Sequence, residues 1–178
     1  MKMIAAHKLE PIRALILDVD GVLTDGKITY TANGMEIKSF HVRDGSGLKY
    51  WHRVGHLTAV LSGRESAATR LRAKELGVKV VEAGAKDKLP ALRRIVEELG
   101  IDLKECAYLG DDLPDIPPMR AVGLPLAIAD AAADVREIAV GVTESKGGAG
   151  AAREVVEIIL RAQGRWESIL ERYLGPLT

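Results

Sequence analysis

Short apolar segments alternate with helix-like stretches along this chain, and that alternation constrains the fold more than any other feature. Strands are predicted at residues 13–19, 57–61, 78–81, 106–109 and 126–129. Helices are predicted at 46–54, 65–76, 87–99 and, broken near Gly164, at 151–173. The alternation predicts an α/β fold, a Rossmann-like parallel sheet with helices on both faces, in a single domain over residues 1–178.

One segment interrupts the alternation. Residues 27–31 and 35–42 flank the sequence Ala-Asn-Gly, and Asn-Gly accepts the positive φ angles of a tight turn. We therefore expect a β-hairpin insertion at about 27–42. At the other end of the chain, a C-terminal tail is expected at about 144–178.

Composition narrows the class of protein. The chain has 178 residues, with 25 Lys plus Arg against 25 Asp plus Glu, and this balance argues against a nucleic-acid partner. Cys106 is the single cysteine, so no intrachain disulfide is expected, and its apolar surroundings predict burial. The first residues lack the apolar core of a signal peptide, and no apolar run approaches the ~20 residues of a spanning helix. We expect a cytoplasmic protein with no membrane partner.

Polar residues follow the predicted strands where each strand ends. Right-handed crossovers bring the carboxyl ends of parallel strands to one edge of the sheet, where ligands bind. The residues that follow the strands are Asp18 and Asp20; Ser62, Gly63 and Arg64; Lys86, Asp87 and Lys88; and Asp111, Asp112 and Asp115. Two carboxylates ~4 Å apart repel by ~4 kcal/mol at an effective dielectric near 20, so they need a proton or a cation. Oxygen ligands favour Mg²⁺, and a metal with a lysine and a hydroxyl suits phosphoryl transfer.

These motifs resemble those of a known group of enzymes. Asp-Val-Asp-Gly-Val-Leu-Thr-Asp-Gly at 18–26, Leu-Ser-Gly-Arg at 61–64, the Lys88 region and Gly-Asp-Asp-Leu-Pro-Asp at 110–115 resemble the four motifs of the haloacid dehalogenase superfamily. His-Val-Arg-Asp-Gly at 41–45 and the segments 84–89 and 147–154 resemble the 3-deoxy-D-manno-octulosonate 8-phosphate phosphatase family, a subclass without a cap domain. The resemblance covers roughly residues 12–164.

The resemblance implies a Mg²⁺-dependent phosphatase that acts on this sugar acid phosphate through an aspartyl-phosphate. Asp18 would be the nucleophile and a metal ligand. Asp20 would be the general acid and base, with its main-chain carbonyl on the metal. Ser62 and Lys88 would hold the phosphoryl group. Asp111 would complete the metal site, supported by Asp112 or Asp115.

The same resemblance implies how the substrate is bound. The expected substrate-binding residues are Asp20, Arg43, Asp44, Gly45, Lys49, Gly63, Arg64, Lys88, Gly148 and Arg153. The glycine-rich stretch 147–150 would be a mobile lid, and a homotetramer would form in which hairpins assemble together. Unpaired strand edges of a hairpin also favour self-association.

Several alternatives remain open. Ser62 and Glu65 fit a capping box, so Ser62 could start the next helix. Arg64 in a first helical turn would oppose the macrodipole, which favours an anion beside it. Lys86 rivals Lys88, and residues 146–150 could be a plain flexible joint. The chain could instead act on another sugar acid phosphate of the nonulosonate 9-phosphate type, or be a non-catalytic oligomerisation module.

Overall fold

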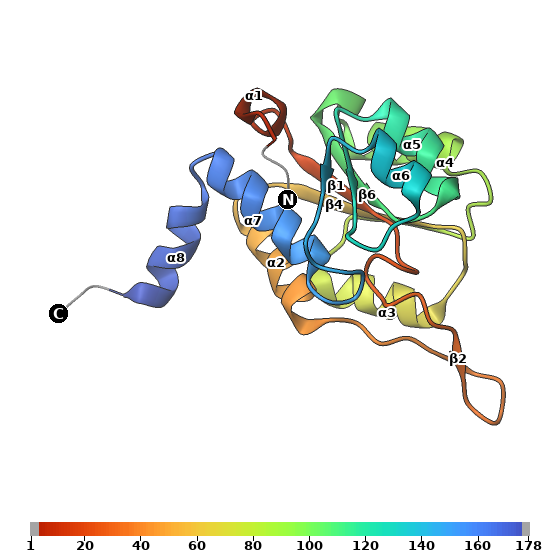
Figure 1. The fold of residues 1–178 in the computed structure, drawn as a ribbon. Coiled ribbons are helices and arrows are strands. Elements are labelled where there is room, and N and C mark those ends of the chain that lie inside the picture. Colours follow the sequence, from red (N-terminus) through yellow and green to blue (C-terminus); the bar gives the residue numbers. More distant parts are fainter. Residues whose placement is uncertain (1–3, 176–178) are drawn as a thin grey trace.

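The computed structural model describes residues 4–175 and contains a six-stranded parallel sheet between layers of helices (Figure 1). The strands lie in the order β5-β4-β1-β6-β7-β8. They are β1 (Ala14–Leu17), β4 (Leu57–Ser62), β5 (Val80–Ala83), β6 (Cys106–Gly110), β7 (Leu124–Ala127) and β8 (Gly141–Val142). The predicted fold class is confirmed.

The helices divide between the two faces of the sheet (Figure 1). One face carries α2 (Val42–Arg53) and α7 (Ala151–Ala162), with α3 (Ala67–Leu76) beside α2. The other carries α4 (Lys88–Leu99), α5 (Ile116–Ala121) and α6 (Ala133–Ile138). The remaining elements are α1 (Ala6–Leu9), 3-10 turns at Leu103–Glu105 and Leu113–Asp115, and α8 (Trp166–Leu174). Across residues 4–175, none of these helices has the length and apolar character needed to cross a bilayer.

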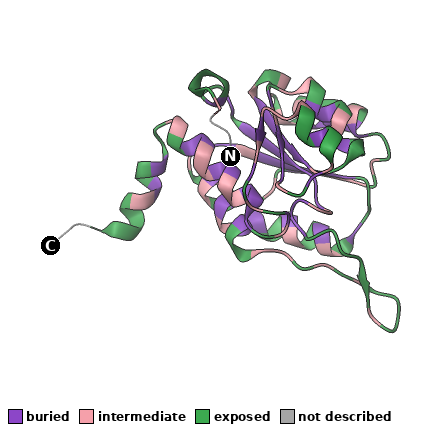
Figure 2. Ribbon diagram, viewed as in Figure 1, coloured by how far each residue is buried: buried purple, intermediate pink, exposed green. Residues whose placement is uncertain are grey.

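The strands form the centre of the core (Figure 2). Leu15, Ile16 and Leu17 of β1 are fully buried although successive side chains point to opposite faces. This is the pattern of a strand covered by helices on both sides. Cys106 at the start of β6 is buried and free, as predicted.

The hairpin projects from the body of the molecule and is largely exposed (Figures 1 and 2). Its strands, β2 (Thr29–Tyr30) and β3 (Glu36–Ile37), pair antiparallel around a turn in which Gly34 has φ +81°. They are shorter than the predicted arms 27–31 and 35–42. The helix that follows starts at Val42, four residues before its predicted start.

The capping-box interpretation of Ser62 is wrong. Ser62 is the last residue of β4, and its hydroxyl accepts a hydrogen bond from the Arg64 amide at 3.2 Å. The helix begins only at Ala67, because Ser66 has extended backbone angles (φ −151°). Arg64 therefore precedes the helix, and the helix-dipole argument for an anion beside it does not apply.

Several short elements were not predicted, among them α5, α6 and β8. The sequence of α5 starts Ile-Pro-Pro, and proline is tolerated at the first helical positions because their amides need no partner in the helix. At six residues each, α5 and α6 are too short to show a helical period. Two-residue β8 exists because β7 provides a pairing edge.

The glycine-rich stretch 147–150 packs against the loop after β1. Gly148 N donates to Val22 O at 2.9 Å, and a Cβ atom on Gly147 would lie 1.5 Å from Gly21 O. Buried Asp44 of α2 accepts hydrogen bonds from the amides of Gly150 at 3.2 Å and Arg153 at 2.9 Å, where α7 begins. The start of α7 is thus tied to α2.

We expect Asp44→Ala to lower the free energy of unfolding by about 1–3 kcal/mol, because two amides would lose their acceptor. Urea unfolding followed by circular dichroism measures the change. Ser46→Ala is the matched control, since Ser46 lies on the same helix and bonds the Val42 carbonyl in an exposed position. Equal effects of the two substitutions would refute the capping role of Asp44.

Candidate active site

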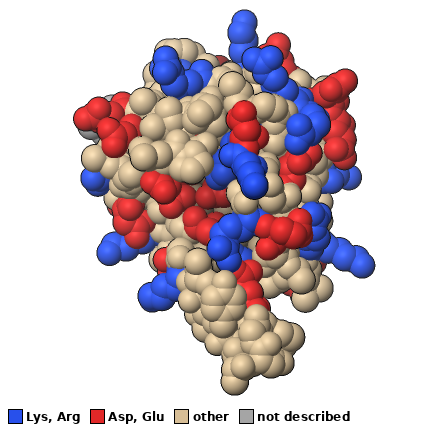
Figure 3. Space-filling view, turned by 90° about the vertical axis from the view of Figure 1, so that its right-hand side faces the viewer, with Lys and Arg blue, Asp and Glu red and all other residues tan. Residues whose placement is uncertain are grey.

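The carboxyl ends of neighbouring strands bring the chemically active side chains together. Leu17 of β1 lies opposite Val60 of β4 and Leu109 of β6, so Asp18, Ser62 and Asp111 reach the same edge. They line a cavity of about 410 Å³, which Asp20, Gly63, Arg64 and Lys88 also line. Figure 3 shows acidic and basic side chains gathered around a hollow above the projecting hairpin.

Lys88, the first residue of α4, lies at the centre of this charge arrangement. Its Nζ is 2.9 Å from Asp18 Oδ1 and 2.7 Å from Asp115 Oδ1, and the residue is buried. Burial alone would lower the pKa of Lys88, but attraction to Asp18 and Asp115 outweighs it and raises the pKa. Lys86 lines the same cavity but is exposed. Of the two rival lysines, the structure brings Lys88 to Asp18.

Asp115 uses both carboxylate oxygens inside the protein. Its Oδ1 accepts from Lys88 Nζ and from Tyr108 Oη, both at 2.7 Å, while its Oδ2 accepts from the amides of Asp111 at 2.9 Å and Asp112 at 3.3 Å. Asp112 itself is exposed. Asp115, rather than Asp112, therefore lies behind the site and fixes the loop that carries Asp111.

Three carboxylates are crowded at this edge. Oxygen atoms of Asp18, Asp111 and Asp115 lie within 4.8 Å of one another. Burial and the charge of Asp115 raise the pKa of Asp18 to about 6, although Lys88 opposes the shift. Burial and the charges of Asp18 and Asp115 raise the pKa of Asp111 to about 8. The cluster therefore needs protons or a cation.

The residues present fit a small divalent cation. Asp111 Oδ1 is buried and has no hydrogen-bond partner among the described residues, so it is available as a ligand. A Cβ atom on Gly21 would lie 2.1 Å from Asp111 Oδ2, so the glycine leaves the room that Asp111 occupies. Hard carboxylate oxygens at such spacing suit Mg²⁺ completed by water.

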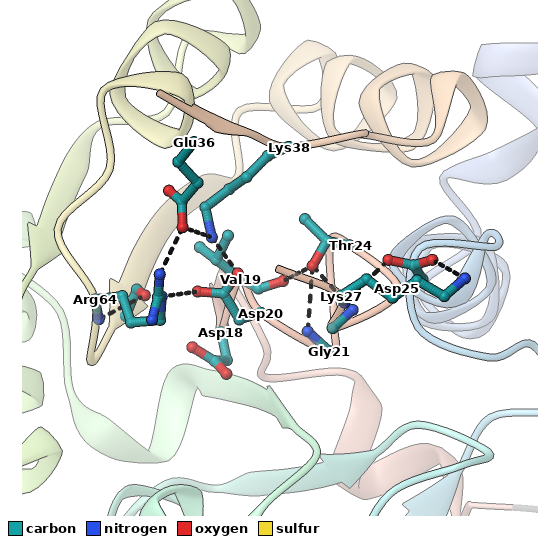
Figure 4. A network of polar contacts seen from close by, with 12 residues as sticks. Asp18, Val19, Asp20, Gly21, Thr24, Asp25, Lys27, Glu36, Lys38 and Arg64 are labelled. Atoms are coloured by element: carbon teal, nitrogen blue, oxygen red, sulfur yellow. Dashed lines mark hydrogen bonds and ion pairs between the residues drawn. The ribbon is translucent and has the colours of Figure 1, made fainter. Parts of the chain in front are cut away.

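The Asp20 side chain turns away from this cluster and towards the hairpin (Figure 4). Its Oδ1 pairs with Lys38 Nζ, while its Oδ2 is 3.7 Å from Arg64 Nε. The loop is shaped by Thr24, whose hydroxyl accepts from the amides of Gly21 at 3.3 Å and Gly26 at 3.2 Å. The structure thus separates the Asp20 carboxylate from the cluster formed by Asp18, Asp111 and Asp115.

The hairpin also reaches Arg64. Arg64 Nη2 donates to Glu36 Oε1 at 2.6 Å, and the Arg64 side chain stays partly exposed at the cavity. Sequence reasoning missed Glu36, Lys38 and Tyr108. In the sequence, Tyr108 looks like an ordinary core residue of a buried strand. Nothing in the sequence shows that the hairpin, which carries Glu36 and Lys38, folds back over Asp20.

Other predicted substrate-binding residues lie outside the acidic cavity. Arg43 and Arg153 line a separate cavity of about 350 Å³, where Arg153 also pairs with Glu157 at 2.5 Å. Asp44 is buried as the cap of α7. Three further positions lie in structural or surface settings: Gly45 against Arg72, Gly148 against Thr24, and Lys49 exposed on α2. None of these residues, nor the stretch 147–150 expected as a lid, lines the cavity around Asp18.

Comparison with known proteins identifies the same family that the sequence motifs resemble. Residues 78–155 match the haloacid dehalogenase-like hydrolase family. The chain is 45% identical over 159 residues to the 3-deoxy-D-manno-octulosonate 8-phosphate phosphatase of Haemophilus influenzae, covering 89% of this chain and 88% of that one.

Solved structures show the same similarity. A probable phosphatase from Pseudomonas syringae superposes with a TM-score of 0.93 at 46% identity, covering 96% of this chain and 97% of that one. The phosphatase of Moraxella catarrhalis, solved with magnesium, phosphate and KDO, gives 0.92 at 40% identity, with 94% and 97% covered. With this identity along nearly its whole length, the chain belongs to the 3-deoxy-D-manno-octulosonate 8-phosphate phosphatase family of haloacid dehalogenase-like hydrolases.

Proposed function

We propose that this protein hydrolyses 3-deoxy-D-manno-octulosonate 8-phosphate to the free sugar acid and phosphate, with Mg²⁺ as cofactor. The observation that carries the proposal is the contact of Lys88 with Asp18 beside the crowded carboxylates, in a cavity that Ser62 and Arg64 also line. The relative from Haemophilus influenzae that is named for this activity is 45% identical to this chain over 159 residues.

The reaction runs in two steps on the side chains of this chain. An oxygen of Asp18 attacks phosphorus, the bond from phosphorus to the sugar oxygen breaks, and the leaving oxygen takes a proton from Asp20. A water molecule then attacks the aspartyl-phosphate and gives a proton back to Asp20, which releases phosphate and restores the Asp18 carboxylate. Lys88 compensates the negative charge on the phosphoryl oxygens, and Ser62 donates a hydrogen bond to them. These oxygens carry the charge that develops in the transition state.

Asp18, Asp111 and the main-chain carbonyl of Asp20 would hold Mg²⁺, with Asp115 behind them. When bound, the ion neutralises charge on the phosphoryl oxygens and allows the carboxylates to coexist. The hydrogen bonds support Asp111 as the ligand and Asp115 as the residue behind it. Both oxygens of Asp115 already accept hydrogen bonds, whereas Asp111 Oδ1 has no partner among residues 4–175.

We expect Asp18→Asn to reduce phosphate release by at least about a thousandfold, because the amide cannot attack phosphorus. The assay measures phosphate from 3-deoxy-D-manno-octulosonate 8-phosphate with and without Mg²⁺. A nine-carbon sugar acid 9-phosphate is compared by kcat/KM.

Asp25→Asn is the matched control, since Asp25 lies in the same loop and pairs with exposed Lys27 at 2.8 Å. Full activity of Asp18→Asn would refute the nucleophile. A higher kcat/KM for the nine-carbon ester would assign the other substrate, and no release from any ester would favour the non-catalytic module.

The stabilising effect of Mg²⁺ should grow with pH. Without metal, Asp18 (pKa about 6) and Asp111 (pKa about 8) keep protons that they lose in the unfolded chain above about pH 4, so their contribution to stability falls as pH rises from about 4 to 8. Mg²⁺ binds the deprotonated carboxylates and removes this penalty. We expect Mg²⁺ to raise Tm more at about pH 8 than at about pH 5.5.

Comparing Tm with and without Mg²⁺ at each pH cancels other titrations, such as those of His52 and His56, whose pKa values burial lowers. Asp111→Asn serves as the control and should remove most of the Mg²⁺ effect. A Tm increase independent of pH, or larger at the lower pH, would contradict the assignment of these carboxylates.

A homotetramer, assembled through the hairpins, is part of the proposal. Ile28, Tyr30, Met35 and Ile37 on or beside the hairpin are 47–62% exposed, and the projecting end of the hairpin carries few charges (Figure 3). Exposed apolar groups on a short two-stranded ribbon favour burial against other copies. We also propose a cytoplasmic location, since a charged sugar acid phosphate stays in the compartment where it is made.

Light scattering should give the mass of four chains, and the double substitution Tyr30→Asp with Ile37→Asp should reduce it, because charges would be buried in the interface. Leu71→Asp is the control, as Leu71 is equally exposed but lies on α3. A monomeric mass for the unmodified protein would refute the tetramer.

A further inference from the structure

The hairpin contributes a buried cation to the site. The Lys38 side chain is only 3% exposed although the hairpin around it is largely open to solvent. An ammonium group taken out of water needs a charged partner, since its desolvation costs several kcal/mol. Figure 4 shows the Lys38 amine directed at Asp20 and Glu36.

The partners of Lys38 come from both sides. It pairs with Asp20 Oδ1 and lies 3.9 Å from Glu36 Oε1, and Glu36 in turn holds Arg64 at 2.6 Å. Two cations and two carboxylates thus form one network between the hairpin, the loop after β1 and the loop after β4. Without Lys38, Arg64 alone would balance Asp20 and Glu36 within this network, and it pairs closely with Glu36 rather than with Asp20.

The two oxygens of Asp20 are not equivalent. Lys38 occupies Oδ1, whereas Oδ2 is buried and has no hydrogen-bond partner in residues 4–175, with Arg64 Nε no closer than 3.7 Å. A group that passes a proton to the substrate needs one free oxygen in a fixed direction.

We propose that Lys38 is a positioning residue: it holds Asp20 Oδ1 and so presents Oδ2 to the leaving oxygen of the substrate. This inference rests on the proposed function. It makes the hairpin part of the catalytic apparatus within a single chain, in addition to its proposed place in the tetramer.

The dependence on leaving group tests the inference. A sugar oxygen must be protonated as it leaves, whereas p-nitrophenolate leaves without help, so poor positioning of Asp20 should affect only the former. We expect Lys38→Met to lower kcat/KM about 10–100-fold for 3-deoxy-D-manno-octulosonate 8-phosphate, but less than about threefold for p-nitrophenyl phosphate. Lys38→Arg, which keeps the charge, should recover part of the loss.

A double-mutant cycle separates positioning from a general structural effect. In an Asp20→Asn background, Lys38→Met should have no further effect, because Lys38 acts through Asp20. Independently of activity, Lys38→Met should shift the ¹³C NMR signal of the Asp20 carboxyl carbon, which Asp20→Asn identifies. Lys27→Met is the matched control, since it removes the same charge beside the hairpin from a side chain that is 80% exposed.

Equal losses for both esters, additive effects in the cycle, or an unmoved Asp20 signal would each overturn the inference. Lys38→Gln is measured in parallel in case Lys38→Met folds poorly. Glucose 6-phosphate is a second sugar ester. If the proposed substrate is wrong, wild-type kcat/KM will favour another ester, while the contrast between sugar and p-nitrophenyl esters in Lys38→Met will persist.

Discussion

The repulsion among carboxylates at the carboxyl edge of the sheet is the constraint on which the rest of the site depends. Asp18, Asp111 and Asp115 are brought within 4.8 Å by strands that the core fixes in register. Buried Lys88 compensates part of this charge, yet burial and the neighbouring carboxylates together raise the pKa values of Asp18 and Asp111. A divalent cation would complete the charge balance and could also compensate the charge of a phosphoryl group, which is why this edge suits phosphate ester hydrolysis.

Two aspartates that are close in sequence have separate environments. Asp18 lies among the buried charges around Lys88, while Asp20 turns to Lys38 and Arg64. Extended backbone would place the side chains of residues 18 and 20 on one face, but the strand ends directly before Asp18 and the chain then bends at Val19 and turns at Gly21 (φ +102°), which separates them. This separation fits the roles proposed for them, with Asp18 attacking phosphorus and Asp20 transferring the proton.

The hairpin stands in place of a cap domain, and its two sides carry different side chains. It supplies Glu36 and Lys38 to the cavity side and presents Tyr30 and Ile37 to the outside. The glycine-rich stretch 147–150 packs against the loop after β1, where there is no room for a side chain at Gly147. The two roles proposed for the hairpin, in catalysis and in association, therefore rest on different side chains.

The α/β fold could be predicted from the residues alone, because buried strands and amphipathic helices have distinct periods. The same pattern identified Asp18, Ser62, Lys88 and Asp111 as residues that follow strands. The residues alone could not decide between Lys86 and Lys88 or between Asp112 and Asp115, since the members of each pair are close in sequence and only the three-dimensional path of the chain buries one of them. The capping-box alternative for Ser62 was wrong because a capping pattern is local, whereas the β4 pairing extends through Ser62. Only the tertiary structure showed that Lys38, Glu36 and Tyr108 contribute to the site. Their partners lie on other segments, and a buried charge pair forms only when folding removes water from both groups.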